Sequence, residues 1–161
     1  MTKPSQMPMI EKRRIEAELI KEIYDVLKQR HGKHEAQEII RISVANSAIT
    51  QGREFRAQYD HMPTLADLAA NHHLWDADDA LERTYLQETD THLDYNITRC
   101  EYAKMYRAMG LGEIGHLLSC NRDGSYCIGF SDNIELTRTQ TIMEGADYCD
   151  FRYRIKSKPS A

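Results

Sequence analysis

The chain has 161 residues, of which 41% are hydrophobic and 29% charged, and its formal net charge at pH 7 is −4. This composition is typical of one globular domain with its own core, and the acidic balance argues against a general nucleic-acid or membrane-surface role. No apolar run approaches the roughly 20 residues that cross a bilayer, and residues 1–10 lack the apolar core of a secretory signal. We therefore expect a single cytoplasmic domain over residues 1–161, with its cysteines reduced and without nucleic-acid or membrane partners.

The first eighty residues predict a helical scaffold. From about Ile10 to Arg30, apolar residues return at the spacing of an amphipathic helix: Ile15, Leu19, Ile23, Val26 and Leu27. From about His34 to Phe55, they return every four residues: Ala36, Ile40, Val44 and Ala48. The short connection at Gly32 favours an antiparallel hairpin of these two helices. After Pro63, Thr64 predicts the cap of a short third helix, with Asp67 in its first turn.

Residues 81–130 predict a strand, two helices and a loop. The stretch 81–95 is rich in Thr and Tyr and has no helical stripe, so we expect one extended strand with a wet face. Thr98, with Glu101 three residues later, is typical of a capping box that opens a helix ending at Gly110. Residues 112–120 predict a further short helix. Gly124 and Gly129 predict a loop after it.

The end of the chain predicts two paired strands. The first carries Ile134, Leu136 and Ile142 on one face, and a turn at 144–147 leads to the second strand. The second strand alternates apolar with polar residues, with the apolar ones as follows: Cys149, Phe151, Tyr153 and Ile155. The predicted fold is α+β, an N-terminal helical hairpin packed with a small antiparallel sheet and further helices. We expect residues 81–156 to carry the site and residues 1–80 to be mostly helical scaffold.

Arg138 and Gln140 interrupt the apolar face of the first predicted strand. A buried guanidinium is costly unless it is paired and hydrogen-bonded. Two interpretations stay open. The residue pattern favours a structural ion pair with a carboxylate such as Asp123 or Asp150, and the alternative is a pocket for an anionic substrate. Arg is well suited to hold a carboxylate through two hydrogen bonds.

Cys100 and Cys120 are the candidate nucleophiles. Cys100 lies in the first turn of the predicted capped helix, next to Arg99, where the helix dipole and the neighbouring charge favour thiolate. Cys120 is followed by Arg122 and Asp123, which supply a cation and a proton relay, but the end of a helix disfavours an anion. For every cysteine of the chain, an inert buried thiol is the alternative interpretation.

No metal site or cofactor is expected. Cys100, Cys120 and Cys149 have no zinc-knuckle spacing. A polar cluster after the third helix likewise matches no ligand spacing, and a solvated helix end is the preferred interpretation: His72, His73, Trp75, Asp76, Asp78 and Asp79. The sequence holds no phosphate loop, dinucleotide fingerprint or Ser-centred elbow. The residues alone predict a polar pocket that bears thiols.

A series of motifs resembles the L-2-amino-thiazoline-4-carboxylic acid hydrolase family. The motifs are Asn96-x-Thr98-Arg99-Cys100-x-Tyr102-Ala103, Leu118-Ser119-Cys120-x-Arg122-Asp123, Gly129-Phe130, Arg138-Thr139-Gln140-Thr141-Ile142-Met143-x-Gly145 and Cys149-Asp150-Phe151-Arg152-Tyr153. The last motif also resembles the close of a 4-vinyl reductase-type ligand-binding domain, which is an analogy at the level of the fold. The matching region covers a little over a third of the chain.

The resemblance implies hydrolytic opening of a small carboxylate-bearing cyclic amidine, isothiourea or cyclic amide, by attack of a thiol or an activated water at the amidine carbon. On this basis we expect Cys120 or Cys100 as the nucleophile and Asp123 as the acid and base. We expect Arg138, Arg122 or Arg152 to clamp the carboxylate of the substrate. The full set of residues expected to bind the substrate is Arg122, Arg138, Gln140, Asn96, Arg99, Asp150, Arg152 and Cys149. The alternative is a non-catalytic small-ligand-binding or sensor domain. The polar residues of the first two helices fit either a solvated face or a contact between copies in a homo-oligomer.

Overall fold

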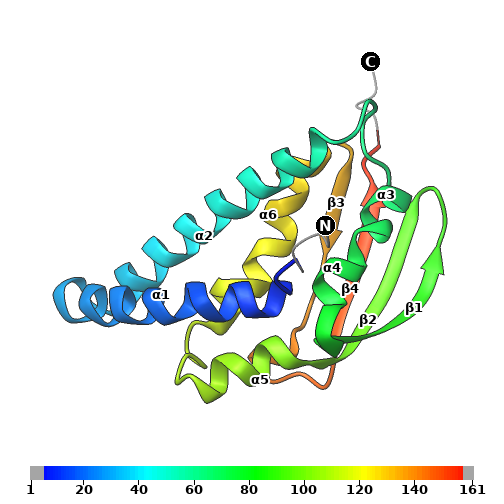
Figure 1. Ribbon diagram of the computed structural model, residues 1–161. Coiled ribbons are helices and arrows are strands. Elements are labelled where there is room, and N and C mark those ends of the chain that lie inside the picture. The colour runs from blue at the N-terminus through cyan, green and yellow to red at the C-terminus, as the bar shows by residue number, and fades with distance from the viewer. Residues whose placement is uncertain (1–5, 158–161) are drawn as a thin grey trace, which may run out of the picture.

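The computed structural model describes residues 6–157 (Figure 1). Two long helices, α1 (Met9–His31) and α2 (Lys33–Arg56), turn back on each other at Gly32, which has a φ of +85°. This confirms the predicted helical hairpin. The later elements are α3 (Leu65–Ala70), α4 (His72–Asp76), β1 (Leu81–Glu88), β2 (His92–Cys100), α5 (Glu101–Ala108), a π-helical turn (His116–Cys120), α6 (Asn121–Phe130), β3 (Ile134–Thr137) and β4 (Cys149–Ile155). No helix in this described part of the chain is both long and apolar enough to span a membrane.

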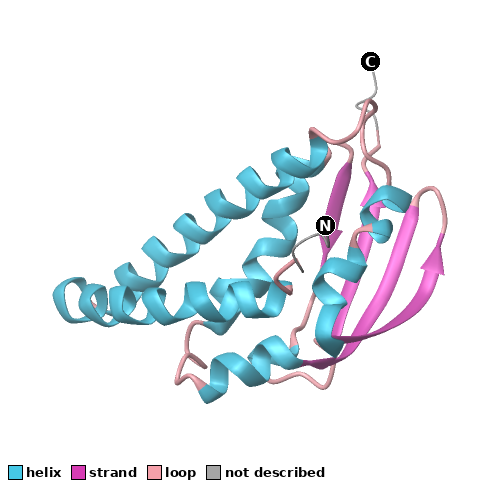
Figure 2. Cartoon of the chain, in the orientation of Figure 1, coloured by secondary structure: helices cyan, strands magenta, loops and turns pink. Residues whose placement is uncertain are grey.

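The four strands form one antiparallel sheet in the order β1-β2-β4-β3, so the predicted α+β fold is confirmed. Figure 2 shows the helices gathered against one face of the sheet. The side chains of β2 and β4 that point to this face are buried with those of α3 and α6: Leu65, Leu68, Leu93, Tyr95, Ile97, Tyr126, Phe130, Cys149, Phe151 and Tyr153. A second core lies between the helices, and Leu81 and Cys100 pack against both cores.

The outer face of the sheet is polar, as the alternation of β4 predicts. Arg154 forms an ion pair with Asp94 of β2, and Arg152 donates a hydrogen bond to Asn96 Oδ1 at 3.0 Å. These four residues therefore lie on the opposite side of the sheet from the helices, because successive side chains of a strand point to opposite faces.

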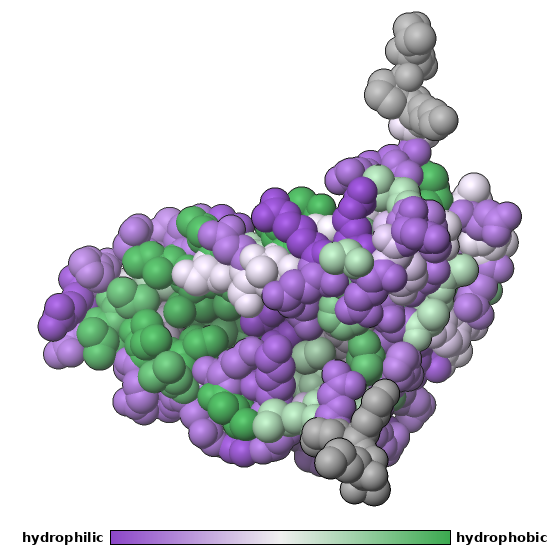
Figure 3. Space-filling model, turned by 45° about the horizontal axis from the view of Figure 1, so that its top comes forward, coloured by the Kyte–Doolittle hydropathy of each residue, from purple (hydrophilic) through white to green (hydrophobic). Residues whose placement is uncertain are grey.

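The apolar stripe of α1 lies on the surface. Leu19 is 65% exposed, and Ile15, Ile23 and Val26 are also exposed. The face that α1 turns inward carries Arg13, Ala17 and Tyr24 instead. Figure 3 shows apolar side chains gathered over the end of the helical hairpin that is far from the sheet. The helix itself is confirmed, and its inner face follows the polar contacts of Arg13 and Tyr24 rather than the largest apolar residues.

Residues 81–100 form two strands, so the single strand predicted for 81–95 is wrong. Thr89 Oγ1 accepts hydrogen bonds from the backbone N–H groups of Thr91 and His92 and stabilises the turn between them. The capping box predicted at Thr98 is also wrong, because Thr98 lies within β2. The N-cap of α5 is Cys100, whose Sγ accepts a hydrogen bond from Ala103 N at 3.4 Å.

Gly124 and Gly129 lie within α6, so the predicted loop is wrong. A Cβ on Gly129 would lie 2.1 Å from Ile49 O of α2, and a Cβ on Gly52 of α2 would lie 2.3 Å from Tyr126 O. Glycine therefore serves here for the close approach of two helix backbones, not for a turn. This contact fixes α6 against α2 and so positions the residues at the start of α6.

The strand predicted from Ile134 to Ile142 ends at Thr137. Asp150 accepts hydrogen bonds from the backbone N–H groups of Thr139 and Gln140, each at 2.9 Å. These side-chain bonds take the place of the backbone hydrogen bonds that a longer β3 would make to β4. Arg138 therefore leaves the sheet and turns into the protein interior, where it meets Asp123.

Candidate functional site

A cavity lies between the inner face of the sheet and the helices. It consists of two adjoining chambers of about 80 Å³ each. Both chambers are lined by Arg13, Trp75, Leu81, Ile97, Arg122, Asp123 and Phe151. We name one of them the thiol chamber, and the residues found only there are Cys100, Tyr102, Ser119, Cys120, Arg138 and Cys149. We name the other the tyrosine chamber, and the residues found only there are Gln51, Leu68, His72, Arg83, Tyr95, Tyr126 and Tyr153.

Asp123 and Arg138 form an ion pair at the wall of the thiol chamber. Arg138 Nη1 donates to Asp123 Oδ2 at 2.6 Å, and Arg138 Nη2 donates to Cys120 O at 2.9 Å. The Asp123 side chain is 31% exposed, and because it lines both chambers this surface faces the cavity. Burial raises the pKa of the Asp123 carboxyl, and the positive charge of Arg138 opposes that rise. The ion pair that the residue pattern favoured is thus present, and it lines the cavity as well.

The three thiols of the thiol chamber are protonated at neutral pH. Burial raises the pKa of Cys100 to about 11, although the Ala103 N–H lowers it, and burial also raises the pKa of Cys149. Burial and then the nearby Asp123 carboxylate raise the pKa of Cys120. Arg99 does not offset this at Cys100, because it pairs with Asp79 and Glu101.

Within residues 6–157, the cysteines form no disulfide, and no group of three His, Cys, Asp or Glu side chains could hold a metal ion.

Arg13 and Arg122 line the entrance to the cavity. A surface groove of about 780 Å³ shares Arg13, Gln51 and Arg122 with the tyrosine chamber. Both guanidinium groups bind Glu16, from Arg13 at 2.8 Å and from Arg122 at 3.4 Å. Burial and the neighbouring Arg13 lower the pKa of Arg122 to about 10, so the site holds more positive charge than one carboxylate balances.

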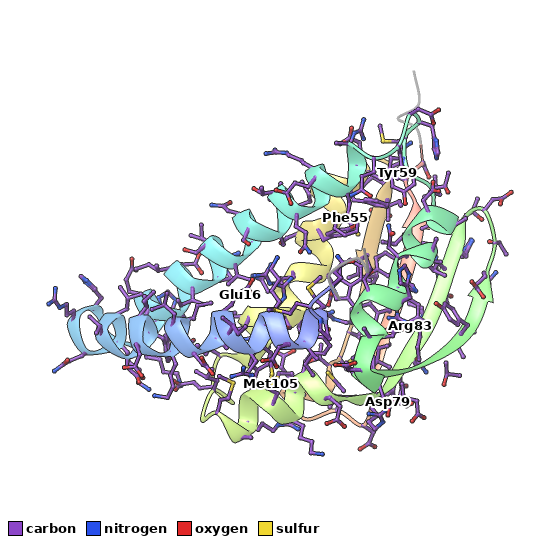
Figure 4. All side chains as sticks on the ribbon, viewed as in Figure 1. Glu16, Phe55, Tyr59, Asp79, Arg83 and Met105 are labelled. Atoms are coloured by element: carbon purple, nitrogen blue, oxygen red, sulfur yellow. The ribbon has the colours of Figure 1, made fainter. Side chains whose placement is uncertain are left out.

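Arg83 reaches the tyrosine chamber from β1. Its Nε and Nη2 donate to the Asp76 carboxylate at 3.2 and 2.7 Å, and its guanidinium lies 4.2 Å from the centroid of the Tyr95 ring. Figure 4 shows Arg83 beside α4 and Glu16 on α1, on opposite sides of the side chains that fill the interior. The described side chains include two buried polar atoms without a hydrogen-bond partner, Arg83 Nη1 and Tyr126 Oη. Both residues line the tyrosine chamber.

The structure brings together six of the residues predicted for the site: Cys100, Cys120, Arg122, Asp123, Arg138 and Cys149. The other five lie outside the cavity lining: Asn96, Arg99, Gln140, Asp150 and Arg152. Asn96 and Arg152 pair on the outer face of the sheet, and Asp150 holds the segment that contains Gln140.

Residues from the first half of the chain complete the cavity, although none of them is among the residues predicted for the site. Arg13 stands one helical turn before Ala17 and two before Ile20, so its place on the inward face of α1 was readable from the spacing. Arg83 lies two residues from both Leu81 and Tyr85, and side chains two residues apart in a strand point to the same face. The spacing therefore indicates that Arg83 shares the face of Leu81. The solvated helix end predicted at His72 is wrong, because His72 is buried and shares a hydrogen bond of 2.7 Å with Tyr85 Oη.

Comparison with known proteins identifies a family and a fold. The family described as L-2-amino-thiazoline-4-carboxylic acid hydrolase matches residues 12–153. No curated protein sequence matches the chain significantly. The crystal structure of the phenol-responsive sensory domain of the transcription activator PoxR, with phenol, is similar in fold, with a TM-score of 0.55 and 12% sequence identity over 89% of this chain and 74% of that one. The family match reaches from α1 to β4 and so includes both halves of the cavity, and the chain belongs to the L-2-amino-thiazoline-4-carboxylic acid hydrolase family.

Proposed function

We propose that the cavity binds a small carboxylate-bearing cyclic amidine, such as 2-amino-thiazoline-4-carboxylate, and hydrolyses its ring. The observation that carries the proposal is the position of Asp123, a cavity-facing carboxyl with a raised pKa, on the wall shared by both chambers. Catalytic acids and bases need a pKa shifted toward the working pH, and burial beside a specific charge partner is how proteins achieve this. The family to which the chain belongs supports a hydrolase.

The charges around the cavity suit an anionic substrate. Four guanidinium groups line it, and three carboxylates pair with them: Arg13 and Arg122 share Glu16, Arg83 pairs with Asp76, and Arg138 pairs with Asp123. A substrate carboxylate bound anywhere in the cavity would offset the net positive charge of these groups taken together, since buried charges are stable only when balanced. The stacked rings of Tyr95 and Phe151, 4.9 Å apart, offer an apolar floor for the heterocycle.

In the proposed reaction, a water molecule adds to the amidine carbon while the Asp123 carboxylate accepts its proton. The ring bond from that carbon to sulfur then breaks, and the product is an N-carbamoyl amino acid with a free thiol. Of the two protons of the water, one ends on the ring nitrogen and the other on the departing sulfur, so that Asp123 returns to its starting state. Arg138 holds Asp123 in place through its hydrogen bond at 2.6 Å.

Water is favoured over a thiol as the nucleophile because burial keeps Cys120 and Cys100 protonated. Cys120→Ser and Asp123→Asn separate the two mechanisms. With water as the nucleophile, Cys120→Ser retains turnover and Asp123→Asn loses it by a factor of about 10² or more, the usual contribution of a general base. If Cys120→Ser loses turnover and the wild-type protein carries a covalent adduct in an intact-mass spectrum, the nucleophile is the Cys120 thiol and not water.

A second candidate is a non-catalytic sensor of a small molecule. It is favoured by the aromatic floor of the cavity, by its protonated thiols and by the fold shared with a sensory domain that responds to phenol. Incubation of the wild-type protein with 2-amino-thiazoline-4-carboxylate distinguishes the candidates. The hydrolase releases one thiol per substrate consumed, whereas a sensor raises its Tm with the ligand and leaves the ligand intact.

A further inference from the structure

The two unpartnered polar atoms of the interior lie in the same chamber. Arg83 belongs to β1 and Tyr126 to α6, yet both line the tyrosine chamber. The Arg83 side chain is 7% exposed and Tyr126 is 6% exposed, so bulk water does not satisfy them. Buried donors are nearly always hydrogen-bonded, and a buried donor without a partner is costly. Both residues line the same chamber, and a ligand bound there is one candidate for the hydrogen-bond acceptor that the two atoms lack.

We propose that Arg83 and Tyr126 bind the carboxylate of the substrate. Asp76 holds two of the three nitrogens of the Arg83 guanidinium and so fixes its plane, which leaves Nη1 to donate to the ligand. The Tyr126 hydroxyl donates to the second oxygen. A carboxylate suits this pair because it accepts several hydrogen bonds at once and because a guanidinium is the side chain that binds it best.

This inference rests on the proposed function and orients the substrate within the cavity. Arg83 stands over the Tyr95 ring and Arg138 over the Phe151 ring, 4.2 and 5.0 Å from the ring centroids, and the two rings stack on each other. A ring held by its carboxylate at Arg83 lies across this floor, with its amidine carbon toward Asp123 and Arg138. Arg83 and Tyr126 would then determine which end of the substrate meets Asp123.

Tyr126→Phe is the decisive variant, since it removes one hydroxyl and keeps the ring that packs against Phe55, Trp75 and Phe130. Tyr59→Phe is the matched control. Tyr59 also packs against Phe130, but its hydroxyl accepts a hydrogen bond from Asn71 at 3.2 Å, and it does not line either chamber. The probes are 2-amino-thiazoline-4-carboxylate and 2-amino-thiazoline, which have the same ring with and without the carboxylate. Kd is obtained from the rise of Tm over a concentration series of each probe, with Asp123→Asn present in every protein compared so that the carboxylate probe is not consumed by hydrolysis.

Tyr126→Phe is expected to weaken binding of the carboxylate probe about tenfold or more, as for a lost hydrogen bond to a charged group, and to leave binding of 2-amino-thiazoline unchanged. Tyr59→Phe changes neither. Without any probe, the Tm of Tyr126→Phe is not below that of the wild type, because the hydroxyl has no partner to lose.

Equal binding of the carboxylate probe by the wild type and Tyr126→Phe would overturn the inference, as would an equal loss for both probes. Waters alone would then satisfy the two atoms, and the carboxylate would lie elsewhere, for example at Arg122. The proposed function can fail separately. If Tyr126→Phe selectively loses binding of the carboxylate probe but the wild type does not hydrolyse that probe, the carboxylate site is supported and the hydrolase is contradicted. If the wild type binds neither probe, both the carboxylate site and the proposed hydrolase are contradicted.

Discussion

The contact between α2 and α6 predicts a large loss of stability for Gly129→Ala. The new Cβ would lie 2.1 Å from Ile49 O and 2.9 Å from Arg53 N, and both are backbone atoms that cannot rotate away. The two helices would have to separate by about 1 Å to restore ordinary contact, and overpacking of this kind costs about 3 kcal/mol. The higher helix propensity of Ala returns about 1 kcal/mol, so we expect a net loss of about 2 kcal/mol.

Gly124→Ala is the matched control on the same helix. A Cβ on Gly124 meets nothing within 4 Å, so the helix propensity acts alone and we expect a gain of about 0.5–1 kcal/mol. Urea denaturation followed by circular dichroism measures both variants, with ΔG obtained by linear extrapolation. The two should differ by about 3 kcal/mol, the sum of these estimates. Equal stabilities, or a Gly129→Ala variant as stable as the wild type, would refute the close approach of α2 and α6.

Three further predictions concern charge and surface. The pKa of the His72 imidazole is lowered from 6.5 to about 3 by burial, so His72 resists protonation in the folded state, and stability is lost as the pH falls below 6.5 toward 3. Between pH 7 and pH 5 the wild type should lose about 2 kcal/mol of unfolding free energy through this group, and an unchanged pH slope in His72→Asn would contradict the assignment. Lys33, Tyr24 and Lys28 lower the pKa of Glu113 from 4.5 to about 2, so its contribution to stability is lost as the pH falls through that range, and Glu113→Gln should flatten the acid limb of a Tm-against-pH series. Leu19→Lys should change the unfolding free energy by less than about 0.5 kcal/mol, as exposed positions do; a larger loss that depends on protein concentration would show that the α1 stripe is covered in a homo-oligomer.

The sequence predicts this fold where local patterns and tertiary contacts agree. The helical hairpin follows from apolar residues at helical spacing, and the alternation of β4 follows from its pleat. The errors fall where a tertiary contact overrides a local signal. Gly129 is typical of a loop in the sequence, but in the structure it allows α2 to approach α6 closely. Thr98 is typical of a helix cap in the sequence, but it lies in β2, which pairs with β1 and β4.

The candidate site is predictable in part for the same reason. Asp123 and Arg138 share the motif-bearing last third of the chain, and their pairing needs only one long-range contact. Arg83 comes from a strand that has no motif. Its role depends on a free N–H group, which only the arrangement of β1, α4 and α6 in space reveals.

The proposed role of Asp123 is tested by the ring opening of 2-amino-thiazoline-4-carboxylate, measured as thiol release by the wild type and by Asp123→Asn. Circular dichroism of both proteins establishes that each is folded. We expect the wild type to release thiol with formation of the N-carbamoyl product and Asp123→Asn to be slower by about 10² or more. Equal rates in the two proteins would contradict the role of Asp123, and the absence of thiol release by the wild type would contradict the proposed hydrolase.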